Sequence, residues 1–436
     1  MIKKIKLSYV ILILAIAGTL LYSNGLRELP APAQNSSITL TYWTFDDMYA
    51  DFMKARVAEW NSRNEPHISL DTSVFSLDEI DYKLWSTLQL GIGAPDIVDM
   101  EYSKFGRYMD PRYNYLMPLN SIIDPKKQNI DILSYSRYQN KGFYYAIDYY
   151  LNNSVVFYNK DILNEAGVDY KAIKTIEDYL AAGKKIKAKT NKYLLAIDFT
   201  DDLVFEQLIS LNDSGYVDAQ DNLQLNAPAN VEVLEMLHSM IYDSQTATLA
   251  PTGDFYSYEF YNLADSEVIA SIIAPYWYLE YIKRYIPNLY GKLIIAPLPE
   301  FSKGAKRTPR ISGVATAVTS QCQHPIIAKN LLRDSRLQNH TGVFVAEELS
   351  GDPIINDYWK SVSANVNDEN NITAESNNLK LLLNIKDSYI TTKCSENYNK
   401  AVNIISNSVL YQVLRENFIS PYQALTEAQE TVKTGN

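Results

Sequence analysis

Residues 142–161, GFYYAIDYYLNNSVVFYNKD, contain the pattern on which the fold prediction is centred. Side chains of residues 143–147 alternate with a period of two, which predicts a β-strand. Residues 152–154, Asn-Asn-Ser, are turn-like, and residues 155–158 predict a second strand. Tyrosine combines a flat apolar face with a hydroxyl group, so this aromatic cluster suits either a ligand with both kinds of surface or the half-buried face of a sheet. The periodicity alone leaves both interpretations open.

The composition is that of an acidic globular protein. A chain of 436 residues is long for one hydrophobic core and indicates two domains. The net charge of −11 argues against nucleic acid as a partner, because binding phosphates requires a basic surface. The two cysteines, Cys322 and Cys394, could form one disulfide in an oxidising compartment or be two unrelated buried thiols.

Motifs for catalysis and cofactor binding are missing from the sequence. The four histidines are scattered, and neither they nor the cysteines have the spacing of a metal site. No zinc-protease, nucleophile-elbow, phosphate-loop or dinucleotide fingerprint is present. We therefore expect no enzyme activity, no cofactor and no bound metal.

The amino terminus has the pattern of an export signal. Three lysines between positions 3 and 6 precede an apolar run at residues 9–22, which is short for a membrane-spanning helix. We predict that residues 1–25 form a signal peptide or an uncleaved signal anchor. Residues 26–37, rich in proline, alanine, serine and asparagine, are typical of a flexible tether. The rest of the chain is expected to be exported.

Several short segments, in a fixed order, resemble one family. Gly-Phe-Tyr-Tyr-Ala-Ile at 142–147, followed by Val-Phe-Tyr-Asn-Lys-Asp at 156–161, resembles the interdomain crossing of sugar-binding extracellular solute-binding proteins. These are the maltose-binding-like receptors of ABC importers. Gly-Ala-Pro-Asp-Ile-Val at 93–98 resembles the family's Gly-x-Pro-Asp-Val strand, and residues 311–318 resemble its strand beside the ligand. The likeness extends over about residues 38–432 and depends on order and spacing.

The resemblance implies an α/β architecture, the two-lobe type II periplasmic-binding-protein fold. Each lobe would be a sheet flanked by helices, and a hinge would join the two. The first lobe would comprise residues 38–148 and 297–345, and the second residues 149–296 and 346–436. A ligand that touches both lobes would then stabilise a closed form by hinge rotation.

Candidate ligand-binding residues lie at predicted strand ends and in the hinge. Ligands of open α/β sheets bind at the carboxyl ends of strands, which singles out Trp43. The resemblance implies that an aromatic residue at 276–277 stacks on a sugar ring, with packing against the next helix as the alternative. For residues 99–102 taken singly, the alternative is a solvated loop position. The candidates share flat rings, hydrogen-bonding groups or close backbone approach: Trp43, Asp96, Asp99, Glu101, Tyr102, Asp148, Tyr149, Tyr150, Tyr276, Trp277, Ser312 and Gly313.

The function implied by the resemblance is capture of a carbohydrate and its delivery to an ABC-type permease. The protein would be a monomer in the periplasm or on the outer face of the cytoplasmic membrane. Three alternatives remain open. The adjacent Tyr149 and Tyr150 would suit an iron- or anion-binding member of the same superfamily. Carboxylates on opposing cleft walls, such as Asp96 and Asp148, would suit a carbohydrate-active enzyme. An uncleaved anchor would suit a membrane-tethered ligand sensor.

Overall fold

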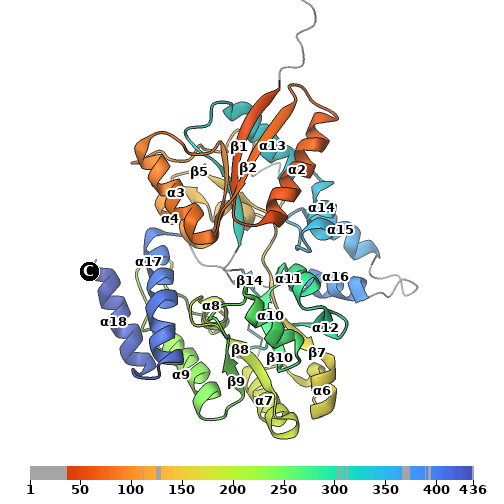
Figure 1. The fold of residues 1–436 in the computed structure, drawn as a ribbon, viewed down its shortest axis with the longest axis vertical. Helices are drawn as coiled ribbons and strands as arrows, with labels where there is room; N and C mark the ends of the chain where they lie inside the picture. Colours follow the sequence, from red (N-terminus) through yellow and green to blue (C-terminus); the bar gives the residue numbers. More distant parts are fainter. Residues whose placement is uncertain are drawn as a thin grey trace, which may run out of the picture.

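Two lobes, each built around a five-stranded sheet, lie one above the other along the long axis of the molecule (Figure 1). The predicted two-lobe α/β fold is confirmed. The computed structural model describes residues 37–110, 112–123, 129–301, 304–305, 308–310, 313–365, 374–387, 389–390 and 394–434. The predicted signal segment and residues 26–36 of the tether lie outside these ranges.

The sheet of the first lobe has the strand order β2-β1-β3-β13-β6. Its first three strands are parallel, whereas β13 runs antiparallel to both β3 and β6. Its strands are β1 (Ile38–Thr44), β2 (Ile68–Val74), β3 (Ile97–Glu101), β6 (Ala146–Asp148) and β13 (Val314–Val318). Helices of the first lobe are α2 (Asp47–Asn61), α3 (Leu77–Leu90), α4 (Phe105–Tyr108), α5 (Leu133–Ser136), α13 (Pro325–Arg336) and α14 (Thr341–Glu348).

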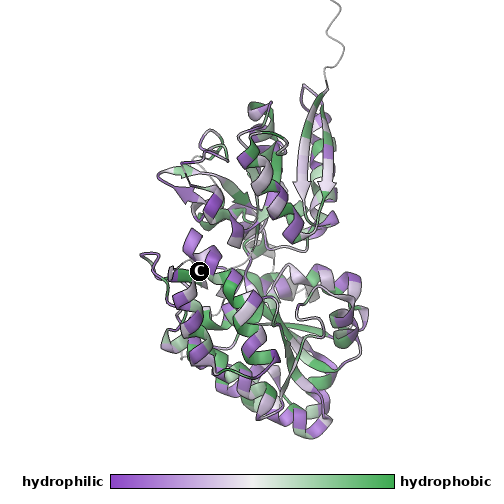
Figure 2. Ribbon diagram, turned by 60° about the vertical axis from the view of Figure 1, so that its left-hand side comes forward, coloured by the Kyte–Doolittle hydropathy of each residue, from purple (hydrophilic) through white to green (hydrophobic). Residues whose placement is uncertain are grey.

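The sheet of the second lobe has the strand order β11-β7-β10-β8-β9, in which β8, β9 and β10 are parallel. All seven residues of β10 are buried, as expected for a strand covered on both faces. Figure 2 shows the strands of this lobe coloured as hydrophobic, with hydrophilic residues on the surrounding helices. Its strands are β7 (Ser154–Asn159), β8 (Tyr193–Ile197), β9 (Ala247–Leu249), β10 (Ile269–Pro275) and β11 (Leu293–Pro297). Its helices are α6 (Lys160–Ala166), α7 (Ile176–Thr190), α8 (Leu203–Leu211), α9 (Pro228–Tyr242), α10 (Tyr258–Asp265), α11 (Tyr278–Tyr285) and α12 (Pro287–Tyr290).

The carboxyl-terminal segments contact both lobes. Helix α17 packs against α4 of the first lobe and against α18, which in turn packs on α9 of the second lobe. Two π-helical stretches, Ile405–Val409 and Tyr411–Arg415, connect α17 to α18. The remaining helices are α15 (Asn356–Asn365), α16 (Ala374–Ile385), α17 (Glu396–Ile404) and α18 (Pro421–Thr434). The remaining strands form two small sheets, β4 (Gln139–Asn140) with β5 (Phe143–Tyr144) and β12 (Thr308–Pro309) with β14 (Tyr389–Ile390).

The crossing segment differs from its prediction in its first half. The alternating residues 143–147 form two strands instead of one, because β5 pairs with β4 while β6 joins β13 in the main sheet. The second predicted strand is present as β7. Both cysteines are buried and free, so the open question of a disulfide is answered in favour of two separate thiols. No helix within the described ranges is long and apolar enough to cross a membrane.

Candidate binding site between the lobes

Three chain segments pass between the lobes and pack tightly against one another. Their described parts include residues 149–153, residues 308–310 with 313, and residues 349–355. The carboxylate of Asp352 accepts hydrogen bonds from the backbone amides of Asn152, at 3.1 Å, and Asn153, at 2.9 Å. Burial raises the pKa of Asp352 to about 6, and these hydrogen bonds oppose the shift. Arg310 of the remaining crossing donates a hydrogen bond of 2.8 Å to Oδ1 of Asn153, so the three crossings are held together as one hinge.

Glycine is required where two of these crossings meet. Gly313 has a φ of 140°, and a Cβ atom there would lie 2.5 Å from Nδ2 of Asn152. A side chain at Gly351 would likewise meet the ring of Tyr150 at 2.6 Å. The backbone therefore approaches the crossing chain more closely than any other residue type allows. Ser312 lies outside the described residues.

Asp99, in the middle of β3, is fully buried and joins β1, β13 and the hinge. Burial raises its pKa, and the nearby Arg336 and the hydroxyl groups of Thr316, Tyr42 and Tyr149 oppose that shift. The hydroxyl donors to its carboxylate are Tyr42, Thr44 at 2.9 Å, Tyr149 at 2.8 Å and Thr316 at 2.7 Å. The hydroxyl of Tyr149 is thus bound to the protein itself, as is that of Tyr150, which contacts the hydroxyl of Tyr49.

Two further candidate carboxylates are also occupied by protein donors. Asp148 forms a buried ion pair with Arg137, whose Nη2 atom lies 2.8 Å from Oδ2, and burial raises the pKa of Asp148 to about 6. Asp96 precedes β3 and accepts the backbone amide of Thr41 at 2.8 Å and that of Gln323 at 3.1 Å. It lies at the end of β3 opposite to Glu101, about 17 Å away along an extended strand of this length.

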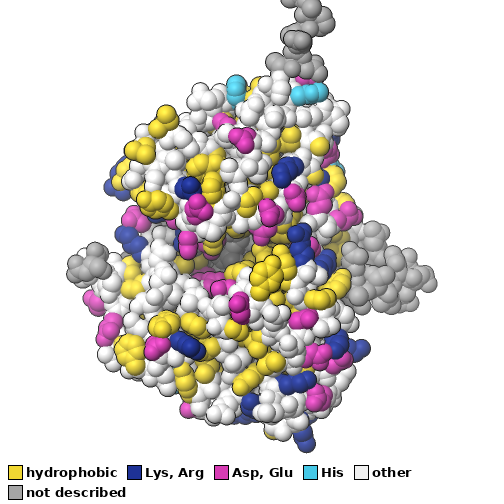
Figure 3. Space-filling view, viewed as in Figure 1, with side chains coloured by type: hydrophobic (Ala, Val, Ile, Leu, Met, Phe, Trp, Pro, Cys, Tyr) yellow, Lys and Arg dark blue, Asp and Glu magenta, His cyan; other side chains and the backbone are white. Residues whose placement is uncertain are grey.

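Figure 3 shows a hollow between the two lobes, with acidic side chains at its floor and hydrophobic side chains on its lower lip. Carboxyl ends of strands from both sheets converge there: Trp43 and Thr44 end β1, Glu101 ends β3, and Tyr276 follows β10. This convergence is the geometry that places ligands in open α/β folds. The side chain of Trp43 is partly buried against Phe75, with ring centroids 5.1 Å apart.

Five carboxylates that raise one another's pKa lie at or soon after the carboxyl ends of β3 and β8, and we call them the acidic floor: Glu101 from the first lobe, and Asp198, Asp201, Asp202 and Glu206 from the second. Burial raises the pKa of each carboxyl group, and repulsion between neighbours adds to the shift. Asp202 accepts a hydrogen bond from Tyr216 at 2.7 Å. None of the five forms an ion pair within the described part of the chain.

Aromatic rings from the hinge and from the start of α11 pack together. Trp277 lies against Tyr150 of the hinge, with ring centroids 6.3 Å apart and planes inclined by 28°. The indole Nε1 of Trp277 is buried without a hydrogen-bond partner in the described structure, so it can donate to a ligand oxygen. Tyr281 of α11 donates a hydrogen bond of 2.5 Å to Oδ2 of Asp46, which belongs to the first lobe. Flat rings and acceptor oxygens thus lie side by side.

The structure separates the predicted residues into three groups. Tyr149, Tyr150, Asp148 and Gly313 meet in the hinge; Trp43, Glu101 and the pair Tyr276 and Trp277 lie at strand ends facing the hollow; Asp96, Asp99 and Tyr102 are buried in the first lobe. The ring of Tyr102 packs against Tyr138 and Tyr398, at 6.0 and 5.5 Å. The ligand-binding role of each residue stays a prediction.

Sequence reasoning missed Asp201, Asp202 and Glu206, and also Tyr281. Asp201 and Asp202 follow closely after β8, so the strand-end rule that selected Trp43 would also have selected them. Glu206 lies one turn further along, on α8. The hydrogen bond between Tyr281 and Asp46 joins residues 235 positions apart and has no local signal.

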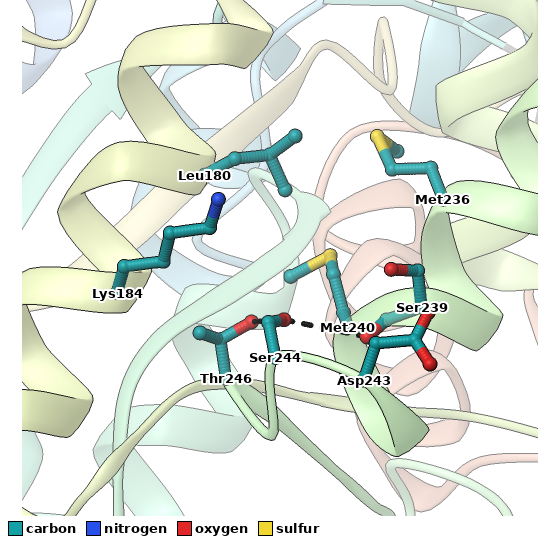
Figure 4. Close-up of a pocket in the computed structure, with 8 residues that line it drawn as sticks. All are labelled: Leu180, Lys184, Met236, Ser239, Met240, Asp243, Ser244 and Thr246. Carbon is teal, nitrogen blue, oxygen red and sulfur yellow. Dashed lines mark hydrogen bonds between the residues drawn. The ribbon is translucent and has the colours of Figure 1, made fainter.

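A cavity of about 570 Å³ lies elsewhere, in the groove between α7 and α9 (Figure 4). It is lined by Leu180, Lys184, Met236, Ser239, Met240, Asp243, Ser244 and Thr246. Thr246 directly precedes β9, so this cavity lies at the amino end of the second sheet. It is therefore at the end of the lobe opposite to the hollow.

Two lobes, a three-segment hinge and a hollow at converging strand ends define a substrate-binding protein of the type II periplasmic class. The family model for bacterial extracellular solute-binding proteins matches residues 33–333. The chain belongs to this family, and the predicted resemblance is confirmed.

Curated relatives and solved structures agree with this assignment. The arabinooligosaccharide-binding protein of Halalkalibacterium halodurans is 31% identical, over 90% of this chain and 88% of the relative. The protein of the same name from Bacillus subtilis is 30% identical, over 98% of this chain and 99% of the relative. The GacH receptor of Streptomyces glaucescens, solved unliganded and with acarbose, has a similar fold, with a TM-score of 0.76 and 18% identity over 92% of this chain and 98% of the receptor.

Proposed function

We propose that this protein captures an oligosaccharide containing arabinose in the hollow between the lobes and delivers it to an ABC-type permease. One observation carries the proposal: aromatic rings and acceptor carboxylates from both sheets converge at the same strand ends. A sugar offers C–H faces to flat rings and hydroxyl donors to carboxylates. The similarity to two arabinooligosaccharide-binding proteins supports arabinose as the sugar.

Hinge rotation supplies the mechanism. Residues 38–148 with 297–345 would move as one lobe against residues 149–296 with 346–436. A ligand that contacts both Glu101 and the members of the acidic floor that belong to the second lobe favours the closed form. Those contacts exist together only when the lobes approach each other. Trp43 and Trp277 supply stacking faces in this proposal, whereas Asp99 and Asp148 hold the hinge in shape.

The same proposal covers the location, oligomeric state and cofactor requirement of the protein. We infer an exported monomer that carries out no covalent chemistry and requires no cofactor or metal. Within the described residues, no group of three or more histidine, cysteine, aspartate or glutamate side chains is arranged to hold a metal ion. Residues 1–25 would direct export, either as a cleaved signal or as an anchor on the outer face of the membrane.

Isothermal titration calorimetry tests the proposal. The purified protein is titrated with arabino-oligosaccharides, with malto-oligosaccharides and with ferric iron. We expect saturable binding of the arabino-oligosaccharides, weakened at least tenfold by Trp277→Ala and by Asp201→Asn with Asp202→Asn, since buried ligand hydrogen bonds and stacked rings contribute about 1–3 kcal/mol each. If only malto-oligosaccharides bind, the ligand is a malto-oligosaccharide and not an arabino-oligosaccharide. If only ferric iron binds, the proposed capture of a carbohydrate is wrong.

A further inference from the structure

A row of aromatic rings leads from the hollow onto the outer surface of the second lobe. Trp277, Tyr281 and Tyr285 are four residues apart, so they share one face of α11 and rise by about 6 Å per step. Ring centroids are 5.9 Å apart between Trp277 and Tyr281, and 6.1 Å between Tyr281 and Tyr285. Tyr258, at the start of α10, continues the row at 6.2 Å from Tyr285. We call Tyr281, Tyr285 and Tyr258 the tyrosine stripe.

The exposure of this row increases steadily away from the hollow. Trp277 is 8% exposed, Tyr285 is 40% exposed and Tyr258 is 73% exposed. Hydrophobic side chains gather on the lower lip of the hollow, over α10 and α11 (Figure 3). Single exposed aromatic residues need no explanation, but a contiguous exposed row that continues a buried site indicates a binding surface.

Neighbouring side chains hold the stripe in place. The ring of Tyr285 stacks on that of Tyr261, with centroids 4.8 Å apart and planes 6° from parallel. The ring of Tyr281 is fixed by its hydrogen bond to Asp46 of the first lobe. Rings that are ordered before binding lose little conformational entropy when a ligand stacks on them. Polar groups border the stripe, since Arg284 and Glu280, which pair at 2.7 Å, also lie on α11.

We propose that the tyrosine stripe is an outer subsite for the protruding end of a long oligosaccharide whose other end is held in the hollow. This inference rests on the proposed function and adds a preference for oligosaccharides of a particular length. The stripe is continuous with the hollow through Trp277, so one linear ligand can occupy both. Its narrow row of flat rings with polar borders matches successive sugar units, each of which has an apolar face and a hydroxyl edge. The protein therefore prefers long chains to disaccharides.

The test compares arabino-oligosaccharides of two or three units with those of six or more, by calorimetry on the full-length protein. We expect the long chains to bind about tenfold more tightly. Tyr258→Ala with Tyr285→Ala should weaken binding of the long chains about threefold to tenfold and leave binding of the short ones unchanged, because only the long chains reach these two rings. Tyr285→Phe should retain long-chain binding, since it keeps the ring. Tyr422→Ala, which removes a 60% exposed tyrosine from α18, is the matched control.

The outcomes separate this inference from the function on which it rests. Short and long chains that bind equally, or a double variant that weakens both to the same extent, would overturn the outer subsite while keeping the sugar-binding function. An equal loss in the Tyr422→Ala control would also overturn it. Failure of every arabino-oligosaccharide to bind the unmodified protein would remove the proposed function, and the outer subsite with it.

Discussion

Asp99 and Asp148 in the first lobe and Asp202 and Glu206 in the second are all at most 6% exposed, yet their surroundings differ. Asp148 has a buried arginine partner at 2.8 Å, and Arg336 lies close enough to Asp99 to oppose the rise in its pKa. Asp202 and Glu206 each accept a tyrosine hydroxyl, but like charges nearby raise their pKa further.

The difference separates structural from ligand-directed carboxylates. A buried charge without a partner destabilises a protein more than a paired charge whose hydrogen bonds are satisfied. Asp99 and Asp148 therefore belong to the framework of the hinge. Those of the acidic floor lower stability in the free protein, and a ligand that donates hydroxyl groups would compensate for that cost.

The largest expected effect on stability comes from removing one of the structural carboxylates. Asp148→Ala leaves Arg137 buried without its carboxylate, which should lower the free energy of unfolding by about 3–5 kcal/mol. Urea denaturation followed by circular dichroism measures the change. The control is Asp51→Ala, which removes an exposed pair with Lys54 and should cost at most about 1 kcal/mol. A loss at Asp148 no larger than the control would show that this carboxylate is not structural.

The second expected effect concerns the backbone of the hinge. Gly313→Ala forces a non-glycine residue into a φ of 140° and pushes its Cβ atom against Asn152, so we expect a loss of about 2–3 kcal/mol. Gly142→Ala is matched to it, because Gly142 also has a positive φ of 86° but nothing within 4 Å of a Cβ atom. Its cost should be about 1 kcal/mol, from backbone strain alone. Equal losses in the two variants would mean that close approach to Asn152 contributes nothing.

The sequence allowed the architecture to be predicted because its signals are local or depend on order. Residues 155–158 have strand composition and form most of β7, and the strand-end rule placed Trp43 and Glu101 beside the hollow. The split of residues 143–147 into β5 and β6 escaped prediction because both halves alternate in the same way, and their partners, β4 and β13, are chosen by tertiary pairing.

Roles of individual carboxylates could not be predicted for the same reason. Thr316 donates to Asp99 across 217 positions, and Asp352 binds Asn153 across 199. No local pattern distinguishes Asp99, which is enclosed by such donors, from Asp202, which lies among other carboxylates. Whether a strand-end carboxylate is structural or faces a ligand depends on these distant partners.

The smallest expected effect tests the acidic floor through the pH dependence of stability. Burial, with repulsion between neighbours, raises the pKa of Asp201 and Asp202 above the value of about 3.9 for an unfolded aspartate. The folded state therefore binds more protons than the unfolded state above about pH 4, so the stability contribution of these groups is present at low pH and is lost as the pH rises toward 7.

Replacing these two aspartates with asparagine removes their titration while preserving their shape. The double variant should be more stable than the unmodified protein by about 1–2 kcal/mol near pH 7, since one unit of pKa corresponds to about 1.4 kcal/mol and solvent screens the partly exposed Asp201. The difference should shrink toward zero near pH 4, where the aspartates are protonated. Asp51→Asn serves as the surface control and should show neither effect. A stability difference that stays constant from pH 4 to pH 7 would contradict the prediction, because it would show that these carboxylates are not held neutral at the cost of folding energy. A gain in stability accompanied by a loss of sugar binding would instead show that the acidic floor is kept for its ligand.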